Sequence, residues 1–429
     1  MKQQSWSKAK RWFAWLGGGV IILCLAADGF WYWINIPPQI KIPTPVMPHP
    51  NGYDYFVRAG AAFVNDNKGV DEITSTSSKP EKYPLAAKEE WLKQNAKAFQ
   101  LLREGLKYPV LQPAVRSYDD EDYHSYAQFR NLARALVVES HARGERGDWN
   151  GAVQSLLDDY DFGNQIARGG PLITGLVSVA IQDISLREFN NLVSHTNATT
   201  AKMVAASIEK LYDQRYPYYK NLEEEKWRTL AEMLELMKHP AQQLNSPSWR
   251  VGMIGSFRFA IFEYLKIFSI SKRKVIHDLT KSMDEGIENA QRPYLEQLPV
   301  IASGDPLAEA LLPVDYKMAR WNWARSDTYS VEVMTMFALR AYKLDNGHYP
   351  TNLKALVPTY LHKVPIDPFD GIAPLHYQLH GEKYLLWSIG PDGVDNHGAP
   401  ITNKYQKRAP YINWSWDSKG DVVAGKNMP

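Results

Sequence analysis

The sequence predicts a mainly α protein with an N-terminal transmembrane helix, a helical domain and a small α+β module at the C-terminus. Three observations carry this prediction. A long apolar run lies near the N-terminus, apolar residues recur at helical spacing from about residue 86 to 325, and two strand-like runs follow one another near residue 380. The 429 residues, 45% of them hydrophobic, are enough for roughly two or three domains with their own cores.

The N-terminal prediction rests on charge and length. Residues 1–11 form a basic tail, which we expect in the cytoplasm, and residues 12–36 are apolar except for Asp28 and Asn35. That run is long enough to span a bilayer, and tryptophans stand at both of its ends, as in interfacial aromatic belts. Residues 12–36 therefore read as a signal anchor with the bulk of the chain outside. A cleaved signal peptide is the alternative, because Cys24-Leu25-Ala26 offers a small-residue site.

Residues 37–50 are rich in proline, which predicts a stiff, extended spacer that lifts the folded part off the membrane. Cys24 is the single cysteine, so an exported domain of this chain must be held by its core and not by disulfides. The net charge of +2 comes from 49 basic and 47 acidic residues mixed along the sequence, which argues against a nucleic-acid partner.

Residues 51–325 are predicted to form the helical domain. A short helix is expected from Tyr53 to Val64, followed by a polar loop to residue 84. Gly147-Asp148 separates two stretches of helical period, which predicts a helical hairpin. This hairpin resembles one tetratricopeptide unit, but the pattern does not recur at a fixed period, so a solenoid is not predicted.

Two further stretches of this domain are strongly apolar. Residues 172–193 are apolar on nearly all sides, which predicts the central core helix, and Gln182 and Asp183 argue against a second membrane span. Residues 253–270 are crowded with Phe, Ile and Leu, but their charged residues share one side. An amphipathic core helix is the favoured interpretation, and contact with the membrane interface is the alternative.

Residues 326–429 are predicted to form the α+β module and a tail. A helix from about residue 315 ends at Asn346-Gly347, and Thr351 is expected to cap a short helix that Pro358 interrupts. Two strands are then expected, Leu375 to Leu379 and Tyr384 to Ile389. The prediction is a hairpin packed on a helix.

The ordered motifs LDNGHYP, LKALVPTYL, VPIDPFDG and SIGPDG, from roughly Ser330 to Asp395, resemble the C-terminal globular part of the major pseudopilin of type II secretion, the G-type protein. A pseudopilin helix runs straight into this module, whereas here a whole helical domain intervenes. The resemblance therefore implies a pseudopilin-like fold at the C-terminus of a bacterial inner-membrane protein linked to secretion or envelope assembly. It does not imply a pilus subunit.

The resemblance also implies a calcium site, because such pseudopilins hold calcium in the loop after the GPDG turn. The matching residues here are Asp392, Asp395 and Asn396, with Asp417 or Asp421 as further candidates. Calcium takes about six to eight oxygen ligands, so a site with so few carboxylates would bind it weakly. The favoured interpretation is that Asp392-Gly393 makes a tight turn after the last strand.

No catalytic motif such as HExxH or GxSxG is present. Two acidic runs, Glu223 to Glu225 and Asp158 to Asp161, are interpreted as solvated surfaces. The sequence thus favours a membrane-anchored extracytoplasmic interaction or scaffold protein with a protein partner in the envelope, whose helical domain presents a groove beside the C-terminal module. The alternative is an envelope hydrolase that acts on glycan or peptide through carboxylates of the helical domain. A cleft with paired, perturbed carboxylates would favour the hydrolase.

Overall fold

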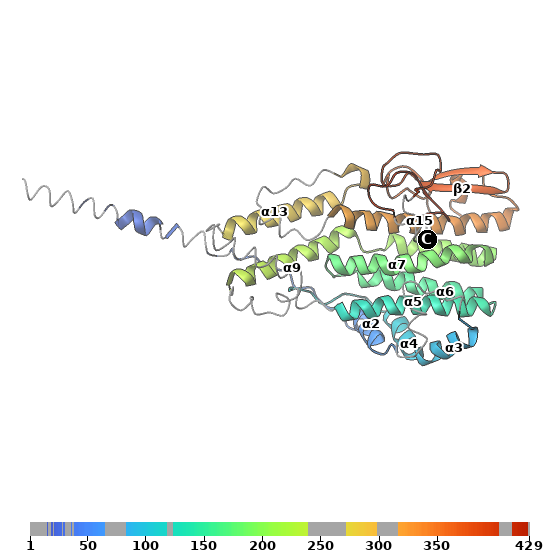
Figure 1. Ribbon diagram of the computed structural model, residues 1–429, viewed down its shortest axis with the longest axis horizontal. Coiled ribbons are helices and arrows are strands. Elements are labelled where there is room, and N and C mark those ends of the chain that lie inside the picture. The colour runs from blue at the N-terminus through green and yellow to red at the C-terminus, as the bar shows by residue number, and fades with distance from the viewer. Residues whose placement is uncertain are drawn as a thin grey trace, which may run out of the picture.

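The computed structural model describes residues 38–64, 83–117, 123–238, 272–297, 316–402 and 414–427, together with scattered positions between 15 and 36. Within these ranges the protein is mainly helical with one small antiparallel sheet, as predicted. Figure 1 shows long helices lying side by side along the longest axis of the molecule. The helices are α2 (Gly52–Ala61), α3 (Leu85–Gln94), α4 (Ala96–Gly105), α5 (Tyr123–Glu145), α6 (Trp149–Ile166), α7 (Leu172–Leu192), α8 (Ala198–Asp213), α9 (Tyr218–Lys238), α13 (Lys272–Ala290) and α15 (Tyr316–Asn346).

The predicted helical hairpin is α5 and α6. Gly147 adopts the left-handed conformation, with φ of 79°, at the turn between them. Asp148 then caps α6 by accepting a hydrogen bond from the backbone N–H of Gly151 at 2.9 Å. Gly147 and Asp148 are adjacent in the sequence, so the turn and the helix start can be recognised without the structure, and the prediction of the hairpin is confirmed. No strand occurs between residues 130 and 195, all of which the structure describes.

Helix α7 is the predicted central helix. It contacts α5, α6, α9 and α15, and Figure 1 shows it in the middle of the layered helices. Its first residue follows Pro171, whose side chain offers no cap. Glu225 of α9 replaces that cap, because its carboxylate accepts the backbone N–H of Leu172 at 3.1 Å. Glu225 is fully buried and also pairs with Arg228. The interpretation of Glu225 as part of a solvated face is therefore wrong.

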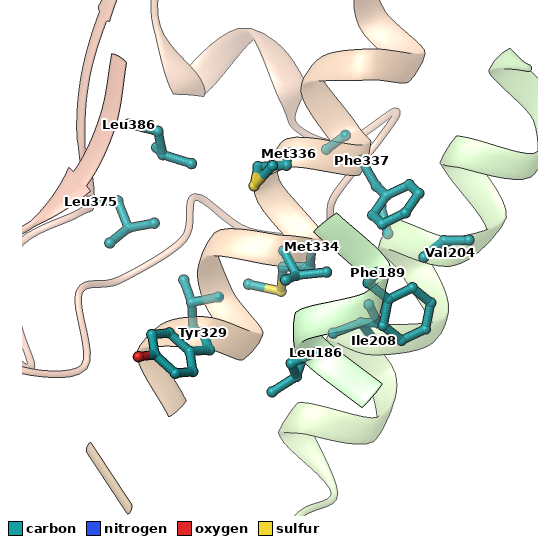
Figure 2. Packing of buried hydrophobic residues seen from close by; sticks show 14 of the residues in the cluster. Leu186, Phe189, Val204, Ile208, Tyr329, Met334, Met336, Phe337, Leu375 and Leu386 are labelled. Carbon is teal, nitrogen blue, oxygen red and sulfur yellow. The ribbon is translucent and has the colours of Figure 1, made fainter. Parts of the chain in front are cut away.

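Helix α15 joins the helical part to the C-terminal module. It runs unbroken for 31 residues, through the expected domain boundary at 325 and 326. Figure 2 shows its two sides: Phe337 faces Phe189 and Val204 of the helical part, whereas Met336 faces the sheet residue Leu386. All of these residues belong to one hydrophobic cluster. The module and the helical part therefore share a core.

The sheet has three strands in the order β1 (His376–His380), β2 (Lys383–Ser388) and β3 (Val422–Val423). Strands β1 and β2 pair antiparallel around the predicted turn, so this prediction is confirmed to within a residue or two. The two-residue strand β3 comes from the tail and was not predicted. The short helix after Thr351 is the 3-10 helix η5 (Leu353–Leu356), and no side chain caps it. The capping role expected for Thr351 is wrong.

The spacer lies against the folded part and not free of it. Ile40 and Ile42 pack on the hydrophobic cluster between α9 and α13, and Arg116 donates a hydrogen bond to the carbonyl of Pro43 at 2.9 Å. Within the described part of the chain, no helix has both the length and the apolar character needed to cross a membrane. Most of the expected anchor at 12–36, the loop from 65 to 82 and the apolar stretch at 253–270 lie outside the described residues.

Candidate functional site

A groove with a volume of about 640 Å³ lies where the helical part meets the C-terminal module. Its walls come from the turn between α8 and α9, the end of α13, one face of α15 and residues 363–371 of the module. Volumes of roughly 300–1,000 Å³ are typical of small-molecule sites. A second hollow, of about 670 Å³, is lined by the spacer and α13 alone, so fewer elements converge there. The groove is therefore the candidate functional site.

Three residues of α15 reach the groove from one side of the helix. Arg320, Trp323 and Asp327 are separated by three and then four positions, a spacing that places side chains above one another on a helix. Tyr218 packs its ring on Trp323, with 4.7 Å between the ring centroids. This spacing is visible in the sequence, although sequence reasoning did not identify these residues as a site.

Arg215 and Asp327 form a two-point ion pair inside the groove. The Nε atom of Arg215 lies 3.0 Å from Oδ1 of Asp327, and Nη2 donates to Oδ2 at 3.2 Å. A further donor of Arg215 bonds the carbonyl of Tyr212 at 2.8 Å. Burial opposes the charge of Arg215, but the Asp327 carboxylate overcomes this effect and holds the pKa of Arg215 above its ordinary value. Asp327 is thus committed to the arginine.

The other two carboxylates of the groove are also committed. Asp213 lies 2.8 Å from the Nζ atom of Lys363. Asp367, in the VPIDPFDG motif, accepts hydrogen bonds from the hydroxyl of Ser388 at 2.7 Å and from the backbone N–H groups of Phe369 and Ile389 at 2.9 Å each. Burial raises the pKa of the Asp367 carboxyl, and these bonds oppose that rise. Asp367 therefore ties the VPIDPFDG loop to the end of β2 in the SIGPDG motif.

Arg320 differs from the other basic groups of the groove. Within the part of the chain that the structure describes, it forms no ion pair. One Nη atom donates to the carbonyl of Arg292 at 3.2 Å, and the buried Nε atom has no hydrogen-bond partner. Burial lowers the pKa of the Arg320 guanidinium, and Asp327 offsets only part of this effect. An arginine remains protonated in such surroundings, so its positive charge stands in the wall without a carboxylate bonded to it.

The predicted calcium residues lie in the loop after β2. Asp395 accepts hydrogen bonds from the indole N–H of Trp387 at 3.0 Å and from the backbone N–H of His397 at 2.8 Å. Its other oxygen lies 3.4 Å from Nδ1 of His376 and 3.5 Å from Nδ1 of His397. These hydrogen bonds hold the pKa of Asp395 below its ordinary value, against the effect of burial. The Asp395 carboxylate thus already has N–H donors on it.

The other candidate calcium ligands also form hydrogen bonds within the protein. Asp392 accepts the backbone N–H of Val394 at 3.3 Å, and Asn396 donates its own backbone N–H to Asp421 at 3.0 Å. Asp417 accepts from the hydroxyl of Ser415. In the described ranges, no group of three or more His, Cys, Asp or Glu residues is placed to hold a metal ion. These carboxylates face N–H and O–H donors in the structure, whereas a calcium ion takes about six to eight oxygen ligands.

The burial of two carboxyl groups was not predicted from the sequence. Asp159, expected on an acidic surface, is fully buried in α6, and that interpretation is wrong. Glu332 is fully buried on α15. Among the described residues, the oxygens of both side chains have no hydrogen-bond partner, and burial raises both pKa values well above the ordinary range. Neither residue is among the described residues that line the groove.

Comparisons with protein-family models, with curated proteins and with solved structures find no match to this chain. Function is therefore inferred from the residues of the groove and from the sequence patterns. The groove combines aromatic, proline and basic side chains with carboxylates that are all held by other groups. Such an arrangement can bind and orient a ligand, and among the described lining residues no carboxylate pair is free for proton transfer.

Proposed function

We infer that the protein is a membrane-anchored extracytoplasmic interaction protein whose groove receives a protein partner of the bacterial envelope. The observation that carries this inference is the groove itself, formed jointly by the helical part and the C-terminal module. An envelope hydrolase would need two carboxylates free to exchange protons, and those of the groove are tied to Arg215, Lys363 and Ser388. The proposed link to secretion or envelope assembly rests on the pseudopilin resemblance.

The membrane anchor is supported by the exposure of the N-terminal segment. Residues 21–27 are helical, and Ile21, Ile22, Leu23 and Leu25 are 61%, 68%, 70% and 65% exposed. Large apolar side chains gathered in this way on a helix need an apolar environment to cover them. A bilayer supplies it for a run as long as residues 12–36, and the basic tail at 1–11 sets the orientation.

A photo-reactive amino acid placed in the groove of the full-length protein tests the binding role. Ile366 lines the groove and is 39% exposed, so it is the test position. Met203 of α8 is the matched control, because it is 38% exposed, apolar and outside the groove. After illumination of intact cells, we expect a discrete cross-linked product from Ile366 and none from Met203. Equal products from both positions, or none from Ile366, would refute the binding role.

A further inference from the structure

One basic side chain of the groove has no carboxylate paired to it. Among the residues that the structure describes, four basic side chains and three carboxylates line the groove. Arg215 is paired with Asp327 and Lys363 with Asp213, while Arg292 lies 3.5 Å from Glu288, which is outside the groove. Asp367 is held by N–H and O–H donors of the module. Arg320 is thus the basic side chain of the described lining that has no carboxylate paired to it.

An arginine in this situation is costly to the free protein. Its buried Nε has no hydrogen-bond partner, and its charge is stabilised by one carbonyl, by the face of the Tyr218 ring at 5.8 Å and only in part by the Asp327 carboxylate, which is bonded to Arg215. Such a loss of stability is typical of a binding residue whose counter-ion is the ligand. Residues that destabilise the free protein are commonly kept because its function needs them. Arg320 therefore points to an anionic ligand.

The surroundings narrow the class of anion. A single carboxylate matches the single guanidinium that has no paired carboxylate, whereas a doubly charged phosphate would bring a second negative charge close to the carboxylate of Asp367, which no cation pairs. The rest of the described wall mixes tyrosines and Gln291 with apolar side chains, namely Val331, Met334, Ile366 and the prolines at 217, 293, 365 and 368, of which Ile366 is 39% exposed. The groove thus fits a monoanion with an apolar body.

Two aromatic faces of the groove are already covered. The guanidinium of Arg215 lies 3.8 Å from the centre of the Tyr212 ring, and Tyr218 packs on Trp323. Sugars bind proteins by stacking on open aromatic faces, and at these rings such faces are taken by other side chains of the protein. A peptide segment is a natural carrier of a carboxylate beside apolar side chains.

We propose that the groove binds a carboxylate of a peptide, and that Arg320 is the residue that receives it. This inference rests on the proposed binding role of the groove and specifies the chemistry of the partner. The peptide's apolar side chain lies against Ile366 and Pro368, while its carboxylate neutralises the guanidinium.

The test measures thermal unfolding of the full-length, detergent-solubilised protein at constant ionic strength. N-acetyl-phenylalanine mimics a peptide C-terminus, and its amide keeps the ring without the charge. We expect the acid to raise the melting temperature in a concentration-dependent way and the amide to leave it unchanged. Acetate should act more weakly because it leaves the apolar wall in water. Equal curves with acid and amide, a stronger response to phosphate, or an equal response to acetate would overturn the proposal.

Variants assign the effect to the residue. Arg320→Gln should weaken the apparent affinity for N-acetyl-phenylalanine by at least about tenfold, because it removes a charge-assisted contact. Arg320→Lys keeps the charge and should retain a reduced response, so it replaces the Gln variant if that protein does not fold. Lys317→Gln removes an exposed charge from the same helix, outside the groove, and should respond as the wild type does. An undiminished response in Arg320→Gln would overturn the assignment.

The two proposals can fail separately. If cross-linking at Ile366 persists in Arg320→Gln at wild-type strength, the groove binds a protein but not through this carboxylate. If N-acetyl-phenylalanine stabilises the wild type while Ile366 gives no cross-link, the carboxylate site stands and the protein partner does not.

Discussion

Replacing Glu209 by Gln should loosen the junction between the helical part and the C-terminal module. Glu209 of α8 is 1% exposed, and its two oxygens each lie 3.0 Å from the backbone nitrogen of His362. Oε1 also accepts the backbone N–H of Lys363 at 3.3 Å, and Oε2 lies 3.1 Å from Nδ1 of His362. One carboxylate thus satisfies two backbone donors at the start of the module.

The magnitude follows from these contacts. A hydrogen bond to a charged group contributes about 1.5–3 kcal/mol, and a Gln side chain keeps one accepting oxygen while turning an NH₂ group toward the same donors. We therefore expect Glu209→Gln to lower the free energy of unfolding by about 2–4 kcal/mol. Urea unfolding followed by near-ultraviolet circular dichroism measures this quantity.

Asp213→Asn provides a matched control on the same helix. Asp213 pairs with Lys363, but both side chains are well exposed, at 45% and 57%. An exposed pair contributes only about 0.2–1 kcal/mol, so this variant should lose less than Glu209→Gln. Equal losses in the two variants would refute the argument that buried backbone donors, and not ion pairing, fix the junction.

Three further predictions concern the buried carboxyl of Glu332, the loop carboxylate of Asp395 and the N-terminal anchor. Burial raises the pKa of Glu332 in the folded protein, so the unfolded chain releases that proton at lower pH and stability falls as pH rises through the carboxyl range. Glu332→Gln should therefore be more stable than wild type at neutral pH, with the difference shrinking below about pH 4 in urea unfolding, and a pH-independent difference would contradict this reasoning. For the wild type, and likewise for Asp395→Ala, the melting curve recorded with calcium should superimpose on the one recorded with chelator, because Trp387 and His397 donate to the Asp395 carboxylate. A melting temperature that calcium raises in the wild type but not in the variant would establish the metal site. Protease added to spheroplasts should digest the bulk of the chain, and complete protection would rule out the proposed topology.

Elements with local signals are predictable from this sequence. The α5–α6 hairpin depends on Gly147 and Asp148, which lie side by side, and the β1–β2 pair depends on a turn of a few residues. Strand β3 has two residues, too few to show a period, and it pairs with β2 from the far end of the chain. Hydrophobic periodicity identifies helices and strands that are long enough for the pattern to repeat. It does not identify a short strand that forms only because a distant strand pairs with it.

The acidic residues show the same limit at the level of single side chains. Glu225 stands in a run of three glutamates, but its oxygen accepts an N–H from Leu172, 53 positions away. Asp327 pairs with Arg215 across 112 positions. The face of α15 that carries Arg320, Trp323 and Asp327 can be read from spacing, whereas the residues opposite it cannot. A binding site between distant segments is therefore found only once the fold is known.

The junction also determines how the groove can work. Helix α15 contributes to the core on both of its sides, and Glu209 fixes the start of the module to α8. Lys363 and Asp213 join the same two segments along the groove wall. A module held by a shared core and by buried hydrogen bonds does not swing as a separate lid. The groove is thus largely preformed, so that a ligand entering it orders few protein groups and the affinity depends mainly on how well its charge meets Arg320.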